Sequence, residues 1–259
     1  MELIILIFFF SIIFIFLRMY LEHFLIIKYS KGKEKEKRFS KAEIRQKIMP
    51  SFYKLGWFTL FFIFNLSCLK GENWKFDKNS YALRPETISK NLKFIYSAEI
   101  SFYLTYLYFL FKEEIQKDFV MQLVHHLITL YLLFFSYIEK LTRYGIVVMF
   151  LHDISDPFLE SAKLLIHYGK NKLANYFFIF FTTTFIFCRL VIFPYMVVSV
   201  LTKYTYNNYS TVSGVFIGLC AGIVTILFLN IAWSFFILKL LFNILFKGNK
   251  VEDTRSRKK

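Results

Sequence analysis

The chain has 259 residues, of which 56% are hydrophobic and 21% are aromatic, and its formal net charge at pH 7 is +15. A soluble domain has about 45–50% apolar residues, whereas here the apolar residues are gathered in blocks of about 20, the length of a membrane-spanning helix. The composition therefore excludes an ordinary soluble enzyme and leaves room for one membrane bundle without a separate soluble domain.

Seven hydrophobic blocks predict an all-α membrane protein with about seven transmembrane helices. The last block is long enough to be one tilted helix or two short ones. The blocks cover residues 3–25, 53–69, 94–111, 119–138, 144–167, 174–200 and 213–243. The chain is accordingly divided into an N-terminal anchor (1–27), a basic linker (28–52), a membrane bundle (53–246) and a basic tail (247–259).

The first block is best interpreted as a retained signal anchor, because no basic residue precedes it and a strongly cationic run follows it. That run, residues 28–54, holds ten Lys/Arg and three Glu, and the tail 247–259 holds six Lys/Arg and two acids. With seven spans both segments lie on one side, which the positive-inside rule makes cytoplasmic. The N-terminus is then lumenal, and nucleic-acid binding is disfavoured. Asn208 begins a glycosylation sequon in a loop that would be lumenal.

Ionisable side chains inside the blocks are the strongest functional signal. A carboxylate at the centre of a spanning helix costs about 3 kcal/mol, so a chain that keeps several is expected to use them. A rise of about 1.5 Å per residue places seven such residues in one band between the membrane centre and the cytoplasmic third. They are Glu99, His125, His126, His152, Asp153, Asp156 and Arg189.

The other charged residues extend this band toward the cytoplasm. Glu160 shares a helix face with Asp156, and Pro157 between them predicts a kink. Arg189 lies at the depth of Asp153, which predicts an ion pair. Lys163, Lys170 and Lys172 fall near the cytoplasmic mouth. The pattern predicts a polar cavity that opens toward the cytoplasm.

Histidines and aspartates in such a cavity suit acyl transfer between lipid-soluble partners. A neutral imidazole can take a proton or attack a carbonyl, and a nearby carboxylate can orient it. The sequence has no glycine-rich phosphate loop and no Gly-x-Ser-x-Gly elbow, so the acyl donor would already be activated. A zinc site built from histidines and an aspartate is the main alternative.

The run from Asp118 to Pro194 resembles the ceramide synthases of the TLC-domain group. The matching motifs are His125-His126-x-x-Thr129, His152-Asp153-x-x-Asp156 followed by Glu160 and Lys163, and the run from Arg189 to Pro194. Glu99-x-x-Phe102-Tyr103 also resembles the third span of that family. The chain departs at Lys140, where the family usually has Asn.

The resemblance implies an enzyme of the endoplasmic reticulum membrane that transfers a fatty acyl group from acyl-CoA to the amine of a sphingoid long-chain base. It also implies a six-helix barrel with one extra N-terminal span. Acyl-CoA is then a substrate, and neither a cofactor nor a metal is expected. A homodimer or a small accessory subunit is left open.

Within this resemblance each polar residue is given an expected role. His125, His126, Asp153 and Asp156 are expected to be catalytic, His152, Glu160, Glu99 and Arg189 to support them, and Lys163, Lys170 and Lys172 to hold the CoA phosphates. One histidine either deprotonates the amine or attacks the thioester, and the sequence leaves both routes open. Three alternatives are a non-catalytic TLC-domain lipid-binding or trafficking protein, a zinc-dependent ceramide hydrolase and a seven-span receptor.

Overall fold

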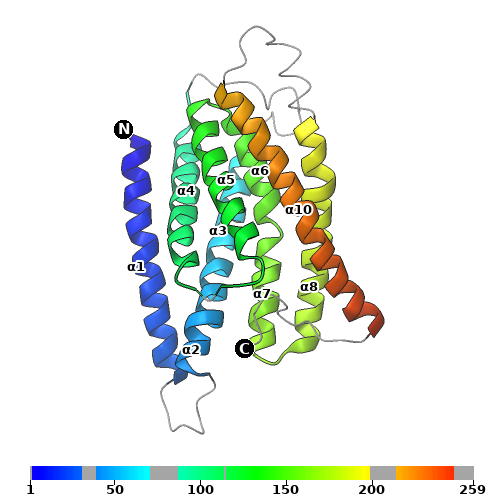
Figure 1. Ribbon diagram of the computed structural model, residues 1–259. Coiled ribbons are helices and arrows are strands. Elements are labelled where there is room, and N and C mark those ends of the chain that lie inside the picture. Colours follow the sequence, from blue (N-terminus) through cyan, green and yellow to red (C-terminus); the bar gives the residue numbers. More distant parts are fainter. Residues whose placement is uncertain (1, 31–38, 71–86, 114, 199–213, 248–259) are drawn as a thin grey trace.

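The computed structural model describes residues 2–30, 39–70, 87–113, 115–198 and 214–247, and every regular element within these ranges is a helix (Figure 1). This confirms the predicted helical class. The elements are α1 (Glu2–Ser30), α2 (Lys41–Glu43), the π-helix η2 (Ile44–Ile48), α3 (Met49–Lys70), α4 (Lys90–Leu110), α5 (Phe119–Ile138), α6 (Thr142–Asp153), α7 (Asp156–His167), α8 (Asn171–Ile186), the π-helix η4 (Phe187–Ile192) and α10 (Gly214–Lys247).

Five stretches of the described chain are long and apolar enough to cross a membrane. They are Glu2–Tyr29, Lys41–Lys70, Phe119–Ile138, Asn171–Val198 and Gly214–Phe246. The last is a single helix, which resolves the choice between one helix and two. The predicted spans at 94–111 and 144–167 are not among the five, since α4 is less apolar along its length and α6 and α7 have 12 residues each.

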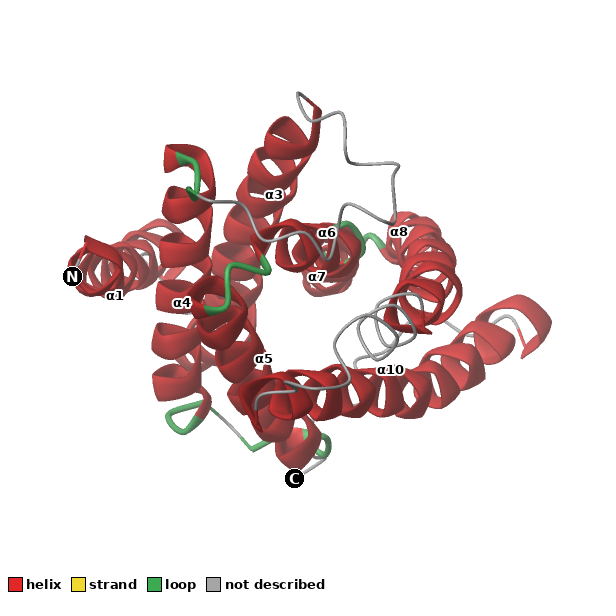
Figure 2. Ribbon diagram, turned by 90° about the horizontal axis from the view of Figure 1, so that it is seen from above, coloured by secondary structure: helices red, strands yellow, loops and turns green. Residues whose placement is uncertain are grey.

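The helices run roughly side by side and surround a common interior. Seen from above, α3, α4, α5, α10, α8 and the α6–α7 pair follow one another around this interior, whereas α1 lies outside, against α4 (Figure 2). Large apolar side chains point outward from this ring, among them Phe235 and Phe246, which are 70% and 73% exposed. Such an apolar exterior fits a surface that contacts lipid.

The N-terminal helix is fixed to the ring by polar contacts as well as by aromatic packing. The Tyr53 hydroxyl donates to the backbone oxygen of Phe14 (3.1 Å), and the Ser101 hydroxyl donates to that of Ile7 (2.9 Å). Arg18 forms a buried ion pair with Glu113. Phe14 and Leu25 of α1 therefore belong to the same buried cluster as residues of α3 and α4.

The block predicted as one kinked helix over 144–167 is instead two helices, which corrects the expectation of a single continuous helix. Helix α6 ends at Asp153 and α7 begins at Asp156, with Pro157 in its first turn. Proline has no backbone N–H, so it cannot donate to the carbonyl of Asp153, four residues earlier, and it crowds the preceding turn. The helix is therefore interrupted beside the predicted catalytic aspartates.

Candidate active site

A pocket inside the helix ring contains four of the seven residues in the predicted band. Glu99 of α4, His125 of α5, and His152 and Asp153 of α6 line it. The rest of the lining is mainly apolar. It comprises Tyr103, Thr129, Leu132, Leu133, Ser136, Leu141, Tyr144, Gly145, Val148, Met149, Val197, Phe216, Leu219, Cys220, Ile223 and Ile226. The pocket thus joins a polar end to a long apolar compartment.

The apolar compartment extends toward the C-terminal end of α5. His125 and Ser136, both in the lining, are 11 residues apart on α5, which corresponds to about 16 Å along the helix axis at the α-helical rise. Beyond them, Leu141, Phe216 and Leu219 form a buried hydrophobic cluster. We call this cluster the pocket floor. In the orientation predicted from charge, it lies in the lumenal half of the membrane.

The two adjacent histidines occupy different environments. His125 lines the pocket, and its ring lies 5.3 Å from that of Trp233. His126 is buried against Tyr106 and Tyr103, with ring centroids at 4.6 and 5.6 Å. Consecutive helical residues point about 100° apart, so one histidine reaches the pocket and the other packs beside α4. In both rings Nδ1 is buried and has no hydrogen-bond partner among the described residues.

Asn65 joins two carboxylates that belong to different helices. Its Nδ2 donates to Glu99 Oε1 (3.0 Å) and to Asp153 Oδ2 (2.9 Å). All three side chains are almost fully buried, with exposed fractions of 0%, 1% and 2% for Asn65, Glu99 and Asp153. In the sequence Glu99 is the only charged residue within its predicted span, 94–111, that lies inside the membrane band. In the structure it is linked to Asp153, because both carboxylates accept from the Asn65 amide of α3.

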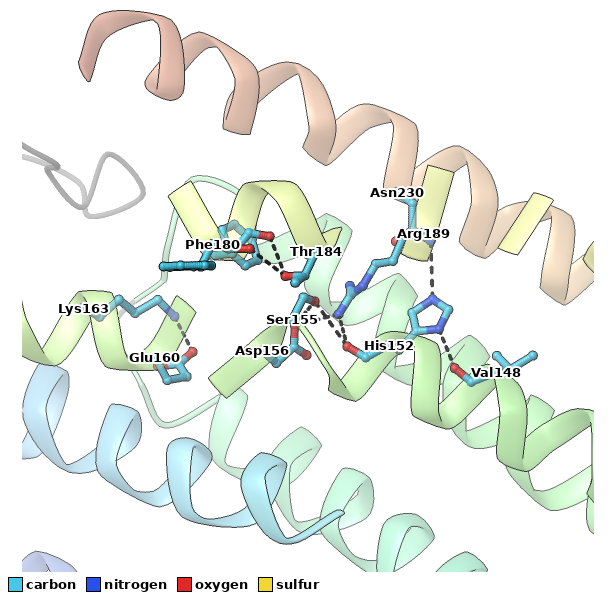
Figure 3. Close-up of polar contacts among 11 residues, drawn as sticks. Val148, His152, Ser155, Asp156, Glu160, Lys163, Phe180, Thr184, Arg189 and Asn230 are labelled. Carbon is cyan, nitrogen blue, oxygen red and sulfur yellow. Dashed lines mark hydrogen bonds and ion pairs between the residues drawn. The ribbon is translucent and has the colours of Figure 1, made fainter. Parts of the chain in front are cut away.

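The predicted ion pair between Arg189 and Asp153 is wrong, because Arg189 binds Asp156 instead. Its NH2 lies 2.6 Å from Asp156 Oδ1 and 2.7 Å from the backbone oxygen of His152 (Figure 3). Equal depth is not sufficient for contact, since the rotation of each helix also decides which side chains meet. Here Asp156 follows the helix break, and its side chain points toward Arg189, which belongs to the π-helix η4.

These contacts stabilise the interruption between α6 and α7. The break frees the His152 carbonyl from regular helix bonding, and it accepts from Arg189 and from the Ser155 hydroxyl (3.3 Å). The same hydroxyl oxygen lies 3.1 Å from Asp156 Oδ1, so its one proton is shared between the two acceptors. A buried carbonyl without a donor would cost about 1–3 kcal/mol. Arg189 and Asp156 therefore brace the helix break, and neither lines the pocket.

The His152 ring is held by two polar neighbours. Nδ1 lies 2.8 Å from the Val148 backbone oxygen, and Nε2 lies 3.4 Å from Asn230 Nδ2 (Figure 3). A carbonyl can only accept, so the proton is assigned to Nδ1, and Nε2 accepts from the amide. With both nitrogens engaged, His152 supports the site, and His125 is the histidine of the pocket whose Nδ1 has no partner among the described residues.

The lysines expected to bind CoA phosphates are not in the pocket. Lys163 forms an ion pair with Glu160 on α7, and Lys170 and Lys172 are exposed where α8 begins. Their role with CoA stays a prediction. Lys54, which the sequence analysis did not select, lies near the start of α3, and its Nζ is 4.4 Å from the centre of the Tyr106 ring. Asn208 lies outside the described residues.

Asn65 and Asn230 are the polar residues of the site that the sequence analysis missed. Each is a fully buried amide within an apolar block, and that position was the available signal. In the part of the chain that the structure describes, no group of three or more His, Cys, Asp and Glu side chains is placed to hold a metal ion. That acyl transfer requires no metal stays a prediction.

Comparison with known proteins identifies relatives of this chain. A family model described as the TLC domain matches residues 47–239. Ceramide synthase 5 of Homo sapiens is 28% identical over 214 residues, which cover 81% of this chain and 54% of that protein. Ceramide synthase 3 of Mus musculus is 32% identical over 215 residues, covering 82% and 55%. The chain spans just over half the length of these curated relatives.

Proposed function

Since the chain belongs to the TLC-domain family, with a match over residues 47–239, we propose that it transfers a fatty acyl group from acyl-CoA to the amine of a sphingoid long-chain base. The observation that carries this proposal is the pocket, in which His125, Glu99 and Asp153 stand at one end of a long apolar compartment. A fatty acyl chain requires such a compartment, and an amine substrate requires a base and a negative charge beside it. The similarity to ceramide synthases supports the same substrates.

The proposal includes the membrane arrangement. The protein is a multi-pass protein of the endoplasmic reticulum membrane, with a lumenal N-terminus and a cytoplasmic C-terminus. In addition to the five apolar stretches, α4 and the α6–α7 pair each cross the membrane once, which makes seven spans. Their positions in the ring support this (Figure 2), as do the basic segments 28–54 and 247–259. The acyl-CoA thioester then reaches His125 from the cytoplasmic side, and its acyl chain extends toward the pocket floor.

His125 carries the chemistry by one of two routes. As a base it takes a proton from the amine, whose nitrogen then attacks the thioester carbonyl. As a nucleophile it attacks that carbonyl first, releases the CoA thiolate and passes the acyl group to the amine. In both routes the bond to sulfur breaks, an amide forms, and CoA leaves as the thiol. Asp153 and Glu99 supply negative charge in the same pocket.

Purified protein in lipid vesicles is expected to form an N-acylated base from acyl-CoA and a saturated sphingoid base, and a metal chelator is expected to leave the rate unchanged. This measurement separates the acyltransferase from the alternatives. Amide formation that stops with chelator and returns with zinc would contradict the metal-free mechanism. Binding of either substrate without a product would favour a lipid-binding or trafficking protein, and net hydrolysis of ceramide would favour the hydrolase.

The pocket floor is expected to set the longest acyl chain that the enzyme accepts. Phe216 is 5% exposed in that cluster, and Phe216→Ala removes its ring. Loss of the ring lengthens the apolar compartment at this end, so the product distribution should shift toward longer acyl chains by a few carbons. Mass spectrometry of the products measures the shift.

The adjacent residue provides the control for this experiment. Ile217 is 59% exposed on the outer face of α10, so Ile217→Ala should leave the distribution unchanged. An identical distribution for Phe216→Ala and the unmodified protein would contradict a floor at this position.

A further inference from the structure

We propose that Asn65 is a positioning residue that holds Glu99 and Asp153 together as one anionic site for the ammonium group of the amine substrate. This inference rests on the proposed function. The sequence analysis expected both Asp153 and Asp156 to be catalytic and Glu99 to support them. In the structure Asp156 is already paired with Arg189, whereas Glu99 and Asp153 line the pocket.

The amide of Asn65 is committed to the two carboxylates. An amide NH2 has two protons, and here one is directed to Glu99 and the other to Asp153 (3.0 and 2.9 Å). The amide oxygen is buried and has no partner among the described residues. Exchanging N and O would turn that oxygen toward two anions. The orientation is therefore set by the carboxylates, even though it leaves an acceptor unsatisfied.

Neither carboxylate is in direct contact with a cation of the described chain. No ion pair formed by the described residues involves Glu99 or Asp153, and Arg189, at a similar depth, is directed to Asp156 and the His152 carbonyl. Two carboxyl groups at 1% and 2% exposure cannot both stay charged away from water without a cation beside them. A substrate ammonium in the pocket would supply one positive charge and three N–H donors, which is what this pair lacks.

The location of the pair fits the reaction. Glu99, Asp153 and His125 line the same pocket, so an ammonium held by the carboxylates lies in the chamber that contains the base. On the way to the amide the ammonium loses two protons, the bond from nitrogen to the acyl carbon forms and the bond from carbon to sulfur breaks. One proton ends on the CoA sulfur and the other is released. Asn65 does not line the pocket and acts through the carboxylates.

The test is a comparison of substrate constants in vesicle-reconstituted protein. Asn65→Leu keeps the size of the side chain and removes the amide, and Glu99→Gln keeps an amide-sized group and removes one charge. Each is expected to raise the KM and the Kd for a saturated sphingoid base by about 10- to 100-fold, with the KM for acyl-CoA within about twofold of its original value. Ser67→Ala, an exposed position on the same helix, should change neither constant.

A second probe examines the charge and hydrogen bonds directly. The N,N,N-trimethyl derivative of the same base keeps the positive charge and has no N–H donors. The unmodified protein is expected to bind it about 10-fold more weakly than the parent base, and Asn65→Leu should bind the two almost equally. If Asn65→Leu does not fold, Glu99→Gln is expected to show the same loss of discrimination.

The outcomes separate this inference from the proposed function. An unchanged KM for the base in the folded variants, or an equal rise in both KM values, would overturn the role of Asn65. Failure of the unmodified protein to N-acylate any sphingoid base would instead overturn the proposed function, whatever the variants bind.

Discussion

His125→Ala is expected to lower the rate of acyl transfer by about 10²–10⁴-fold, the usual contribution of a positioned acid–base or nucleophilic group, while the protein remains in the membrane. The physical reason is its position. His125 is the histidine of the adjacent pair that lines the pocket, and its Nδ1 has no partner among the described residues. The measurement is the initial rate of ceramide formation in membranes that contain equal amounts of each protein.

His126→Ala should also reduce activity, but for a different reason. His126 packs between Tyr106 and Tyr103, so truncation leaves a cavity beside α4 and allows α5 to shift. Incubation with acyl-CoA alone separates the two histidines and the two routes. An acylated peptide at His125 would establish the covalent route, and unmodified protein under turnover conditions would favour general base catalysis. Full activity of the double His→Ala variant would contradict the site.

The second large effect is expected at the helix break. Arg189→Leu should lower the free energy of unfolding by about 1–3 kcal/mol, because it leaves the partly buried Asp156 carboxylate, which is 21% exposed, without its charged donor. It also removes a donor from the His152 carbonyl. Thermal unfolding of detergent-solubilised protein measures this loss.

A paired substitution tests the explanation. Arg189→Leu combined with Asp156→Leu removes both charges, so it should recover part of the stability that the single change loses. The recovery should be incomplete because the His152 carbonyl still lacks its donor. Unaltered stability of Arg189→Leu, or a double variant less stable than the sum of the single changes, would contradict a bracing role for this pair.

The sequence predicted several of the helices well, because their length and apolar composition follow from one-dimensional patterns. Block 119–138 coincides with α5, and residues 214–243 of the last block lie within α10. Residues of the predicted band, Glu99, His125 and Asp153, do meet in one pocket.

What the sequence could not supply was the rotation of each helix about its axis. Depth suggested that Arg189 would meet Asp153, but the break before Pro157 and the π-helix η4 direct Arg189 to Asp156. The sequence did not show which of His125 and His126 reaches the pocket, because that depends on how the neighbouring helices pack against α5. Asn65 was overlooked because an amide carries no charge, although its place in an apolar block was visible.

Expression in a cell that cannot make ceramide, followed by mass spectrometry of its lipids, tests the central claim most directly. The account predicts that this chain restores N-acylated sphingoid bases, and that His125→Ala at the same membrane level does not. Lipids that remain without ceramide in cells with the folded, membrane-inserted protein, or ceramide restored equally by His125→Ala, would contradict it.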